Sequence, residues 1–434
     1  MRTTFSESQL AEPAIREANA ILRNCVHCGF CLPTCPTYAV LGDELDSPRG
    51  RISLIQHMLE QGGAPETKAV HHIDRCLSCL GCATACPSGV DYTHLIDTAR
   101  AHIETHHRRS WADRWTRWLV AFVLTRPRLF RAAIRAAWLA RSFSYVLPSR
   151  LRRLMESVPR RIDAPSPMSV SQVFEAIGHR RKRVALLVGC VQQVLGGRIN
   201  EATVRILRRH GCEVVIAANA SCCGALTQHM GREQQARAAA CGTLSAWQRE
   251  LDGEGLDAIV VNASGCGTTV KDYGHMFADD PEWSAVAARV AHIAVDVSEL
   301  LSDLGLTAPV APARAPIVAY HDSCSLQHGQ RLTAMPRALL ETAGFDVREI
   351  VEGNMCCGAA GVYTLLQPHL SDVLGHRKGT HVAATGAAAT AAGNLGCLLH
   401  LERFSDLPAV HTVELLDWAT GGPVPEPLRC LADG

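Results

Sequence analysis

One cysteine pattern occurs twice in the first hundred residues. The first copy, residues 25–36, reads CVHCGFCLPTCP, and the second copy, residues 76–87, reads CLSCLGCATACP. Both follow C-x2-C-x2-C-x3-C-P, the spacing that holds a 4Fe-4S cluster in bacterial ferredoxins, where the fourth cysteine ligates the neighbouring cluster. We therefore expect two 4Fe-4S clusters in this part of the chain.

The spacing also predicts which cysteines share a cluster. Three thiolates at steps of three can converge on one cube, and the turn at the following proline directs the fourth cysteine away from it. The predicted sets are Cys25, Cys28, Cys31 and Cys86 for one cluster, and Cys76, Cys79, Cys82 and Cys35 for the other. The alternatives are reduced structural thiols or two zinc sites. Zinc needs only four tetrahedral ligands and explains neither the third cysteine nor the Cys-Pro ending.

Composition limits the remaining possibilities. A chain of 434 residues is expected to form two or three domains, and a net charge of +1 gives no overall field that would attract nucleic acid. Nineteen cysteines would suggest disulfides in a secreted chain, but the first 25 residues lack the apolar core of a signal peptide. We expect a cytoplasmic location with cysteines serving as ligands. No stretch is long and apolar enough to predict a transmembrane helix, so any membrane contact is expected to be peripheral.

The residues around the two cysteine runs have helical spacing. Apolar residues recur with a helical period in residues 1–24, 54–59 and 91–107, with a Gly62-Gly63 stop after the second segment. We therefore predict a mostly α-helical two-cluster ferredoxin domain over residues 1–105.

Two arginines and four histidines of this domain also have predicted positions or roles. Arg49 and Arg51 are expected either to raise the reduction potential of a cluster by their positive charge or to lie on a solvated turn. Four histidines come in pairs without a third ligand and are expected at the surface: His71, His72, His102 and His106.

Residues 106–180 are predicted to form a basic helical connector. Residues 106–161 contain fourteen arginines against two acidic residues, and an aromatic stripe at helical spacing comprises Trp111, Trp115, Trp118 and Phe122. Such a helix can lie on an anionic membrane surface, or its stripe can pack against the next domain. Pro127 and Pro148 are expected to break it, and residues 163–167 read as a linker. Nucleic-acid binding is not favoured because no recognition motif accompanies the arginines.

After the linker, short apolar runs alternate with helical patterns. Strands are predicted at residues 184–188, 214–217, 259–261 and 317–320. This alternation indicates α/β layers with right-handed crossovers. The fold class predicted for the chain is therefore α+β multidomain, with a helical ferredoxin domain followed by an α/β region.

The α/β region contains an internal duplication. In each half one cysteine is followed 32 residues later by Cys-Cys-Gly and then by a further cysteine, which predicts repeats at residues 181–312 and 313–434. Each repeat places its cysteines after strand ends, the edge at which α/β sheets bind ligands. The candidate metal ligands are Cys190, Cys222, Cys223 and Cys266 in the first repeat, and Cys324, Cys356, Cys357 and Cys397 in the second.

Three interpretations of these eight cysteines remain open. They can hold one or two additional clusters, zinc or another ion, or they can be structural thiols. Cys212, Cys241 and Cys430 have no counterpart in the duplication and are expected to be ordinary buried or surface thiols.

Five segments carry a resemblance to a known family: GDELDSPRGR at 42–51, ASGCG at 263–267, CVHCGFC at 25–31, CCGA at 222–225 and CCG at 356–358. Over nearly its full length the chain resembles the iron-sulfur subunit of bacterial glycolate oxidase, also called glycolate dehydrogenase. The resemblance implies a subunit that passes electrons, while flavin-containing (FAD) sister subunits oxidise glycolate to glyoxylate. The Cys-Cys-Gly half also resembles the subunit of heterodisulfide reductases that holds unusual clusters. There each repeat usually ends in Cys-x-x-Cys, whereas Ala263 and Asn394 occupy the first of those positions here.

Three functional hypotheses follow. No G-x-G-x-x-G motif follows a strand, so a chain with clusters but without a hydride acceptor needs a flavoprotein partner to oxidise a hydroxy acid. The leading hypothesis is an electron-transfer subunit between the partner's flavin and a membrane quinone-type acceptor, with glycolate as substrate, or lactate or glycerol-3-phosphate instead. The second is disulfide reduction at the Cys-Cys-Gly half, and the third is a scaffold for assembly or membrane anchoring. No catalytic residue is predicted on this chain.

Overall fold

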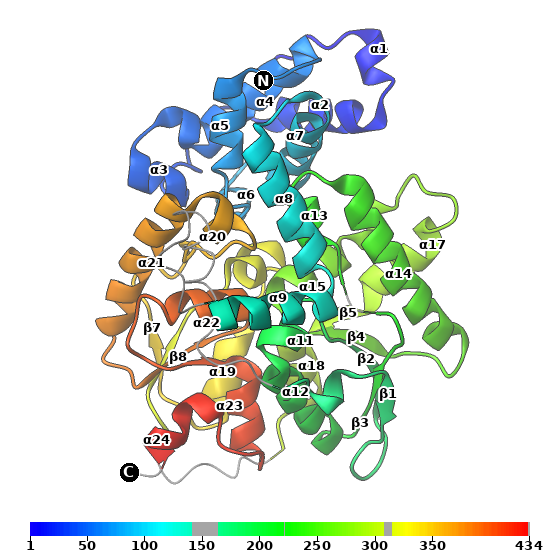
Figure 1. Cartoon of the computed structure of the whole chain (residues 1–434), viewed down its shortest axis with the longest axis vertical. Helices are drawn as coiled ribbons and strands as arrows, with labels where there is room; N and C mark the ends of the chain where they lie inside the picture. Colours follow the sequence, from blue (N-terminus) through cyan, green and yellow to red (C-terminus); the bar gives the residue numbers. More distant parts are fainter. Residues whose placement is uncertain (141–163, 221, 308–314, 433–434) are drawn as a thin grey trace.

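The computed structural model describes residues 1–140, 164–220, 222–307 and 315–432. A helical N-terminal domain occupies one end of the molecule, and two units that each contain a sheet lie beside one another beneath it (Figure 1). The predicted fold class, a helical domain followed by a duplicated α/β region, is confirmed.

The N-terminal domain packs short helices around the two cysteine runs. Its helices are α1 (Glu7–Leu10), α2 (Pro13–Asn24), α3 (Pro36–Leu41), α4 (Pro48–Gln61), α5 (Thr67–Asp74), α6 (Gly81–Thr84) and α7 (Tyr92–His106), with a 3-10 turn η1 (Glu44–Asp46). The prediction of one helix over residues 1–24 is wrong, because Pro13 has no backbone N–H to continue α1 and instead begins α2. The apolar face of α2 is buried in a core shared with α4, α5 and α7.

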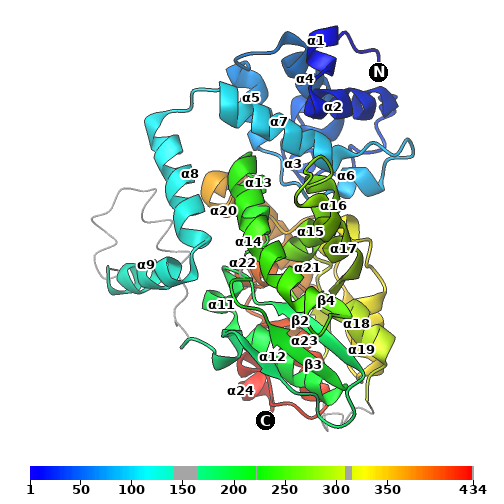
Figure 2. The same cartoon turned by 90° about the vertical axis from the view of Figure 1, so that its right-hand side faces the viewer.

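Helices α8 (Trp111–Leu124) and α9 (Pro127–Ala140) lie on the outside of the molecule, at the left of Figure 2. Helix α8 buries Arg117, which pairs with Asp74 and Asp113, together with the small apolar residues beside it. The aromatic stripe therefore faces outward, with exposed fractions of 75% for Trp111, 51% for Trp115, 43% for Trp118 and 37% for Phe122. The interpretation in which this stripe packs against the next domain is wrong. Pro127 breaks the helix as predicted, whereas Pro148 lies outside the described residues.

No helix in the described ranges combines the length and apolar composition needed to cross a bilayer.

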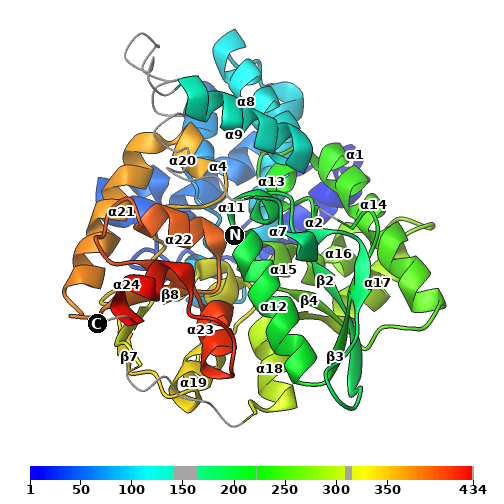
Figure 3. The same cartoon turned by 60° about the horizontal axis from the view of Figure 1, so that its bottom comes forward.

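The sheets of the two repeats share an order of four parallel strands, and they lie side by side in Figure 3, where the bottom of the molecule comes forward. The first sheet has the order β1-β3-β2-β4-β5, where β1 is antiparallel and the other strands are parallel, with bounds β1 (Gln172–Phe174), β2 (Lys182–Leu187), β3 (Cys212–Ile216), β4 (Ala258–Val261) and β5 (Ala294–Asp296). The second sheet is wholly parallel in the order β7-β6-β8-β9, with bounds β6 (Val318–Tyr320), β7 (Val347–Glu349), β8 (Ala389–Ala392) and β9 (Ala409–His411). The order β3-β2-β4-β5 thus recurs as β7-β6-β8-β9. Strand β1 lies within the predicted connector, so the end of that segment belongs to the first sheet.

Helices cover both sheets and join the repeats. Those of the first repeat are η3 (Pro167–Ser169), α11 (Gln192–Leu195), α12 (Gly197–Arg209), α13 (Ala225–Gln228), α14 (Glu233–Asp252), α15 (Ser264–Lys271), α16 (Tyr273–Met276), α17 (Ser284–Ile293) and α18 (Val297–Leu304). Those of the second are the π-helical turn η4 (Ser325–Gly329), α19 (Met335–Thr342), α20 (Tyr363–Leu366), α21 (Pro368–Ala383), α22 (Leu395–Leu401), α23 (Thr412–Ala419), η5 (Glu426–Leu428) and α24 (Arg429–Ala432). Helices α12 and α23 pack together, and Arg205 of α12 pairs with the buried Asp417 of α23. The repeats therefore share one hydrophobic core.

The first repeat meets the N-terminal domain at a close backbone approach. Gly231 has φ of +77°, and a Cβ atom there would lie 2.3 Å from the carbonyl oxygen of Arg100 on α7. Gly255 has a similar φ of +82° but open space around it.

We predict that Gly231→Ala lowers the free energy of unfolding by about 1–3 kcal/mol more than Gly255→Ala, because overpacking adds to the backbone strain that both variants share. Urea unfolding midpoints of the two variants provide the measurement. Equal midpoints would show that the close approach at Gly231 does not constrain the two parts of the molecule.

Candidate metal centres

All eight cysteines of the two N-terminal runs line two adjacent recesses. The first recess is lined by Cys25, Cys28, Cys31, Cys82 and Cys86, and the second by Cys35, Cys76, Cys79 and Cys82. This grouping is the one that the crossed pairing requires, with Cys82 bordering both recesses. Thiol groups arranged in this way suit a soft metal centre such as an iron-sulfur cluster. The individual ligand assignments stay predictions.

The backbone of both runs is wound tightly. His27, Ser78 and Leu80 have φ of 55°, 51° and 62°, a region that costs a non-glycine residue about 1–2 kcal/mol. Strain of this kind persists only where the surroundings impose it, and it concentrates at ligand sites. Helix α3 begins at Pro36 with Cys35 as its N-cap residue, and Cys35 borders the second recess rather than the first.

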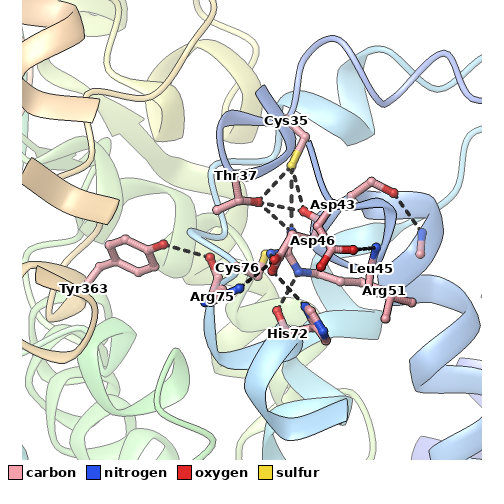
Figure 4. A network of polar contacts seen from close by, with 12 residues as sticks. Cys35, Thr37, Asp43, Leu45, Asp46, Arg51, His72, Arg75, Cys76 and Tyr363 are labelled. Atoms are coloured by element: carbon pink, nitrogen blue, oxygen red, sulfur yellow. Dashed lines mark hydrogen bonds and ion pairs between the residues drawn. The ribbon is translucent and has the colours of Figure 1, made fainter. Parts of the chain in front are cut away.

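A buried arginine lies beside Cys35 (Figure 4). Arg51 Nη1 donates to Thr37 Oγ1 at 3.0 Å and lies 3.8 Å from Cys35 Sγ, while Arg51 Nε donates to the His72 carbonyl at 2.8 Å. The solvated-turn interpretation is wrong for Arg51, which is 1% exposed, because α4 begins at Pro48 and its first turn faces inward. Arg49 is partly exposed and pairs with Glu44.

Arg51 stays charged in this setting. Burial alone would lower its pKa, but the neighbouring Cys76, Tyr92, Cys35 and Asp46 raise it above the ordinary value. The guanidinium therefore places a positive charge next to the thiols of the second recess.

The partner of Arg51 is a fully buried carboxylate. Asp46 Oδ1 lies 3.2 Å from Arg51 Nη2 and 3.2 Å from His72 Nδ1, and Asp46 Oδ2 lies 2.8 Å from Arg75 Nη1. The expectation of a surface position is wrong for His72, because α5 turns this side chain toward Asp46. His71 and His106 are exposed and His102 is partly exposed. The hydroxyl of Tyr363, from the second repeat, donates to the Arg75 carbonyl at 2.9 Å.

In the first repeat the four candidate cysteines follow the ends of β2, β3 and β4 and form two close pairs. Cys190 lies beside Cys222, and Cys223 lies beside Cys266. A hydrogen bond from the Cys190 thiol lowers the pKa of Cys222 to about 7, against the effect of burial, and the Gly224 backbone N–H assists. Tyr273 donates to the Cys223 carbonyl at 2.9 Å.

In the second repeat the four cysteines follow β6, β7 and β8 and form one continuous group. The Sγ atoms of Cys324 and Cys356 are 3.8 Å apart, and Cys357 lies beside both Cys356 and Cys397. Hydrogen bonds from Cys324 and Cys357 hold the pKa of Cys356 well below its ordinary value, and Cys357 does the same for Cys397 with a smaller effect from His321.

Sequence reasoning missed one residue of this group. His321 is 1% exposed, and its ring lies with the thiols of Cys357 and Cys397 so that the three potential ligand atoms are within 4.8 Å of one another. The available signal was its position: a polar residue directly after an apolar strand, three residues before Cys324. Of the cysteines outside the duplication, Cys212 is buried, Cys241 is half-buried and Cys430 is exposed.

The second recess and the second repeat are in contact. Leu77 and Cys79 of the recess pack with Cys324 and Cys356 of the repeat. Beside them Thr84 Oγ1 lies 2.8 Å from His328 Nδ1. Cysteines of the N-terminal domain and of the second repeat therefore pack in one apolar cluster.

Two recesses lined with cysteines, together with two further groups of cysteines in the α/β repeats, are the features of an iron-sulfur protein. The family model for a 4Fe-4S dicluster domain matches residues 21–90, and the model for a cysteine-rich domain matches residues 184–271 and 318–402. The chain is 36% identical to the glycolate oxidase iron-sulfur subunit of Escherichia coli K12, covering 96% of this chain and 99% of that protein. It is 33% identical to the probable glycolate oxidase iron-sulfur subunit of Bacillus subtilis 168, covering 92% and 94%. The chain belongs to the glycolate oxidase iron-sulfur subunit family, which confirms the resemblance.

A partial likeness extends to a second group. Lactate utilization protein A of Oceanobacillus iheyensis is 28% identical over 54% of this chain and 96% of its own length.

We predict that Arg51→Gln lowers the reduction potential of the metal centre in the second recess, because a buried positive charge beside Cys35 is lost. A change of about 60 mV corresponds to ~1.4 kcal/mol for a one-electron couple, and the loss is expected to reach this size. Redox titration followed by electron paramagnetic resonance (EPR) measures it. Arg51→Lys keeps the charge and serves as the control, and an unchanged potential in Arg51→Gln would contradict the electrostatic role.

Proposed function

We propose that this chain is the electron-transfer subunit of a flavin-dependent 2-hydroxy-acid dehydrogenase complex that acts on glycolate, with FAD on partner subunits. The observation that carries the proposal is the contact between the second of two adjacent cysteine-lined recesses and the cysteines of the second repeat. Iron-sulfur clusters bound at such thiols accept and release single electrons. Electrons would pass from the partner's flavin toward a membrane quinone-type acceptor.

The residues of this chain have defined roles in the proposal. Cys25, Cys28, Cys31 and Cys86 would hold one 4Fe-4S cluster, and Cys76, Cys79, Cys82 and Cys35 the other. The eight cysteines of the two repeats would hold one or two further centres. Arg51 supplies positive charge at Cys35, and Asp46 holds Arg51 and Arg75 in place.

Two observations bear on the substrate and on the alternative reaction. The relatives that match nearly the whole chain are named for glycolate oxidase, whereas the relative named for lactate utilization matches about half of it, so glycolate is favoured over lactate. Disulfide reduction at the repeats is less well supported, because six of the eight cysteines there are buried and offer a disulfide substrate little access.

The complex purified anaerobically with its native partners tests the proposal. We expect glycolate to reduce an artificial dye and to bleach the cluster absorbance, with a flavoprotein in the preparation. Cys35→Ser is expected to remove the cluster of the second recess, so that glycolate still reduces the flavin while dye reduction falls at least tenfold, about 1.4 kcal/mol. Cys430→Ser, at an exposed thiol outside the duplication, is the control.

Other results would change the assignment. Bleaching by lactate or glycerol-3-phosphate alone would keep the electron-transfer role and replace the substrate. A preparation without flavoprotein and without bleaching, but with activity on disulfides, would contradict the proposal.

We also propose that α8 and α9 make a peripheral contact with an anionic membrane surface. Alongside the exposed aromatic stripe of α8, helix α9 exposes Trp138 and Leu139, at 48% and 70%. Exposed arginines surround both helices: Arg108, Arg114, Arg126, Arg128 and Arg135. Aromatic side chains beside arginines match the chemistry of an anionic lipid surface.

Binding to vesicles of zwitterionic lipid with and without anionic lipid tests this contact. Replacing Trp111, Trp115 and Trp118 together by Ser is expected to weaken binding to anionic vesicles about tenfold or more, since buried aromatic area is lost. The matched control replaces three exposed apolar residues elsewhere by Ser: Val173, Ile177 and Val351. Equal binding of the two variants would assign the stripe to a protein partner instead.

A further inference from the structure

The two repeats share a scaffold but differ around their cysteines. Equivalent positions follow from the spacing to the cysteines, and the second repeat has His321, Asn394, Lys378 and His400 where the first has Leu187, Ala263, Leu244 and Thr269. Each of the four differences puts a nitrogen-bearing side chain near the second group of thiols. The surroundings of the two groups of thiols therefore differ in polarity and charge.

His321 is the difference closest to the thiols. Strand β6 ends at Tyr320, and the His321 backbone N–H donates to the Ala391 carbonyl of β8 at 2.8 Å, which fixes the residue at the sheet edge. Its ring is buried with Cys357 and Cys397 and makes a polar contact with the Cys397 thiol, while its Nδ1 makes no hydrogen bond of ordinary geometry among the described residues. A metal–nitrogen bond would satisfy this nitrogen.

The surrounding groups complete a binding site. Asn394 Nδ2 lies 3.4 Å from Cys397 Sγ, and the Gly358 backbone N–H lies 3.5 Å from Cys356 Sγ. Lys378, 2% exposed, donates to the Glu352 carbonyl at 2.6 Å and keeps its amino group close to Cys356 and Cys357. These donors and the cation stabilise negative charge on sulfur.

We propose that His321 is an imidazole ligand of an iron-sulfur centre in the second repeat, together with thiolates from Cys324, Cys356, Cys357 and Cys397. The proposal rests on the proposed function in so far as the second repeat binds iron. The first repeat offers four thiolates and Leu187 at the equivalent position, so its centre has no such nitrogen. Imidazole is a neutral ligand, so a centre that binds it at a position where a further thiolate could bind has a higher reduction potential, as in Rieske centres.

The proposed centre lies next to the second recess of the N-terminal domain. Cys324 and Cys356 pack against Cys79 of the second recess. A centre of higher potential at this place draws electrons from the N-terminal domain into the second repeat.

The test uses the full chain, prepared anaerobically with iron and sulfide and labelled with ¹⁵N-histidine. Pulsed EPR of the wild type is expected to show a strongly coupled histidine nitrogen on a centre distinct from the two ferredoxin-type clusters. In His321→Leu, which copies the first repeat, the coupling is expected to disappear while the ferredoxin-type signals remain. His369→Gln, an exposed position on α21 of the same repeat, is expected to keep the coupling.

A second variant keeps the test decisive if His321→Leu does not fold. His321→Cys is expected to retain iron, lose the nitrogen coupling and lower the midpoint potential of the centre. Iron in the second repeat without histidine coupling, or coupling that survives in His321→Leu, overturns the proposal and leaves the proposed function intact. No iron beyond that of two 4Fe-4S clusters also overturns it. Loss of glycolate-dependent bleaching in the wild-type complex would instead count against the proposed function.

Discussion

The buried carboxylate of Asp46 is the group on which the arrangement of the two cysteine runs depends. It lies between the runs in sequence and contacts Arg51 of α4 together with His72 and Arg75, which belong to α5 and its C-terminal cap. Arg75 directly precedes Cys76, and the backbone carbonyl of Asp46 accepts a hydrogen bond from Thr37 Oγ1 at 2.8 Å beside Cys35. Removing this carboxylate would leave the buried Arg51 guanidinium without its charged partner, at a cost of about 3–5 kcal/mol. The ion pairs thus position both runs from one point.

Sheet topology explains why the cysteines of the repeats face this domain. In parallel sheets, loops at the carboxyl ends of neighbouring strands meet at one edge, and the candidate cysteines of each repeat all follow such ends. Contacts of Tyr363 with Arg75, and of Cys356 with Cys79, join that edge to the N-terminal domain. The duplication therefore places two groups of thiols at the same side of the molecule as the two recesses.

Much of this arrangement could be predicted from the sequence, and the exceptions have physical reasons. The cysteine spacing and the equal 32-residue intervals identified the helical domain and the duplication, because ligand geometry restricts those positions tightly. Strand β8 was not predicted, since its residues Ala389–Ala392 have low strand propensity and are held by burial between β6 and β9. Spacing alone could not distinguish a buried Arg51 from a solvated one, because its burial depends on the distant Asp46 and Thr37 contacts.

His321 could not be predicted from the cysteine spacing either, because it belongs to the residues in which the two repeats differ. A search based on repetition finds the residues that both copies share, and His321 has no counterpart in the first repeat, where Leu187 packs into the core. Because both repeats have four candidate cysteines, any difference in the metal centre that each can bind depends on the side chains beside the cysteines. The second repeat places Lys378, Asn394 and two imidazoles beside its thiols, while the equivalent positions of the first repeat hold Leu187, Leu244, Ala263 and Thr269. Duplication conserved the order of the cysteines along the chain and their positions after the strand ends, whereas the side chains beside them differ in charge and polarity.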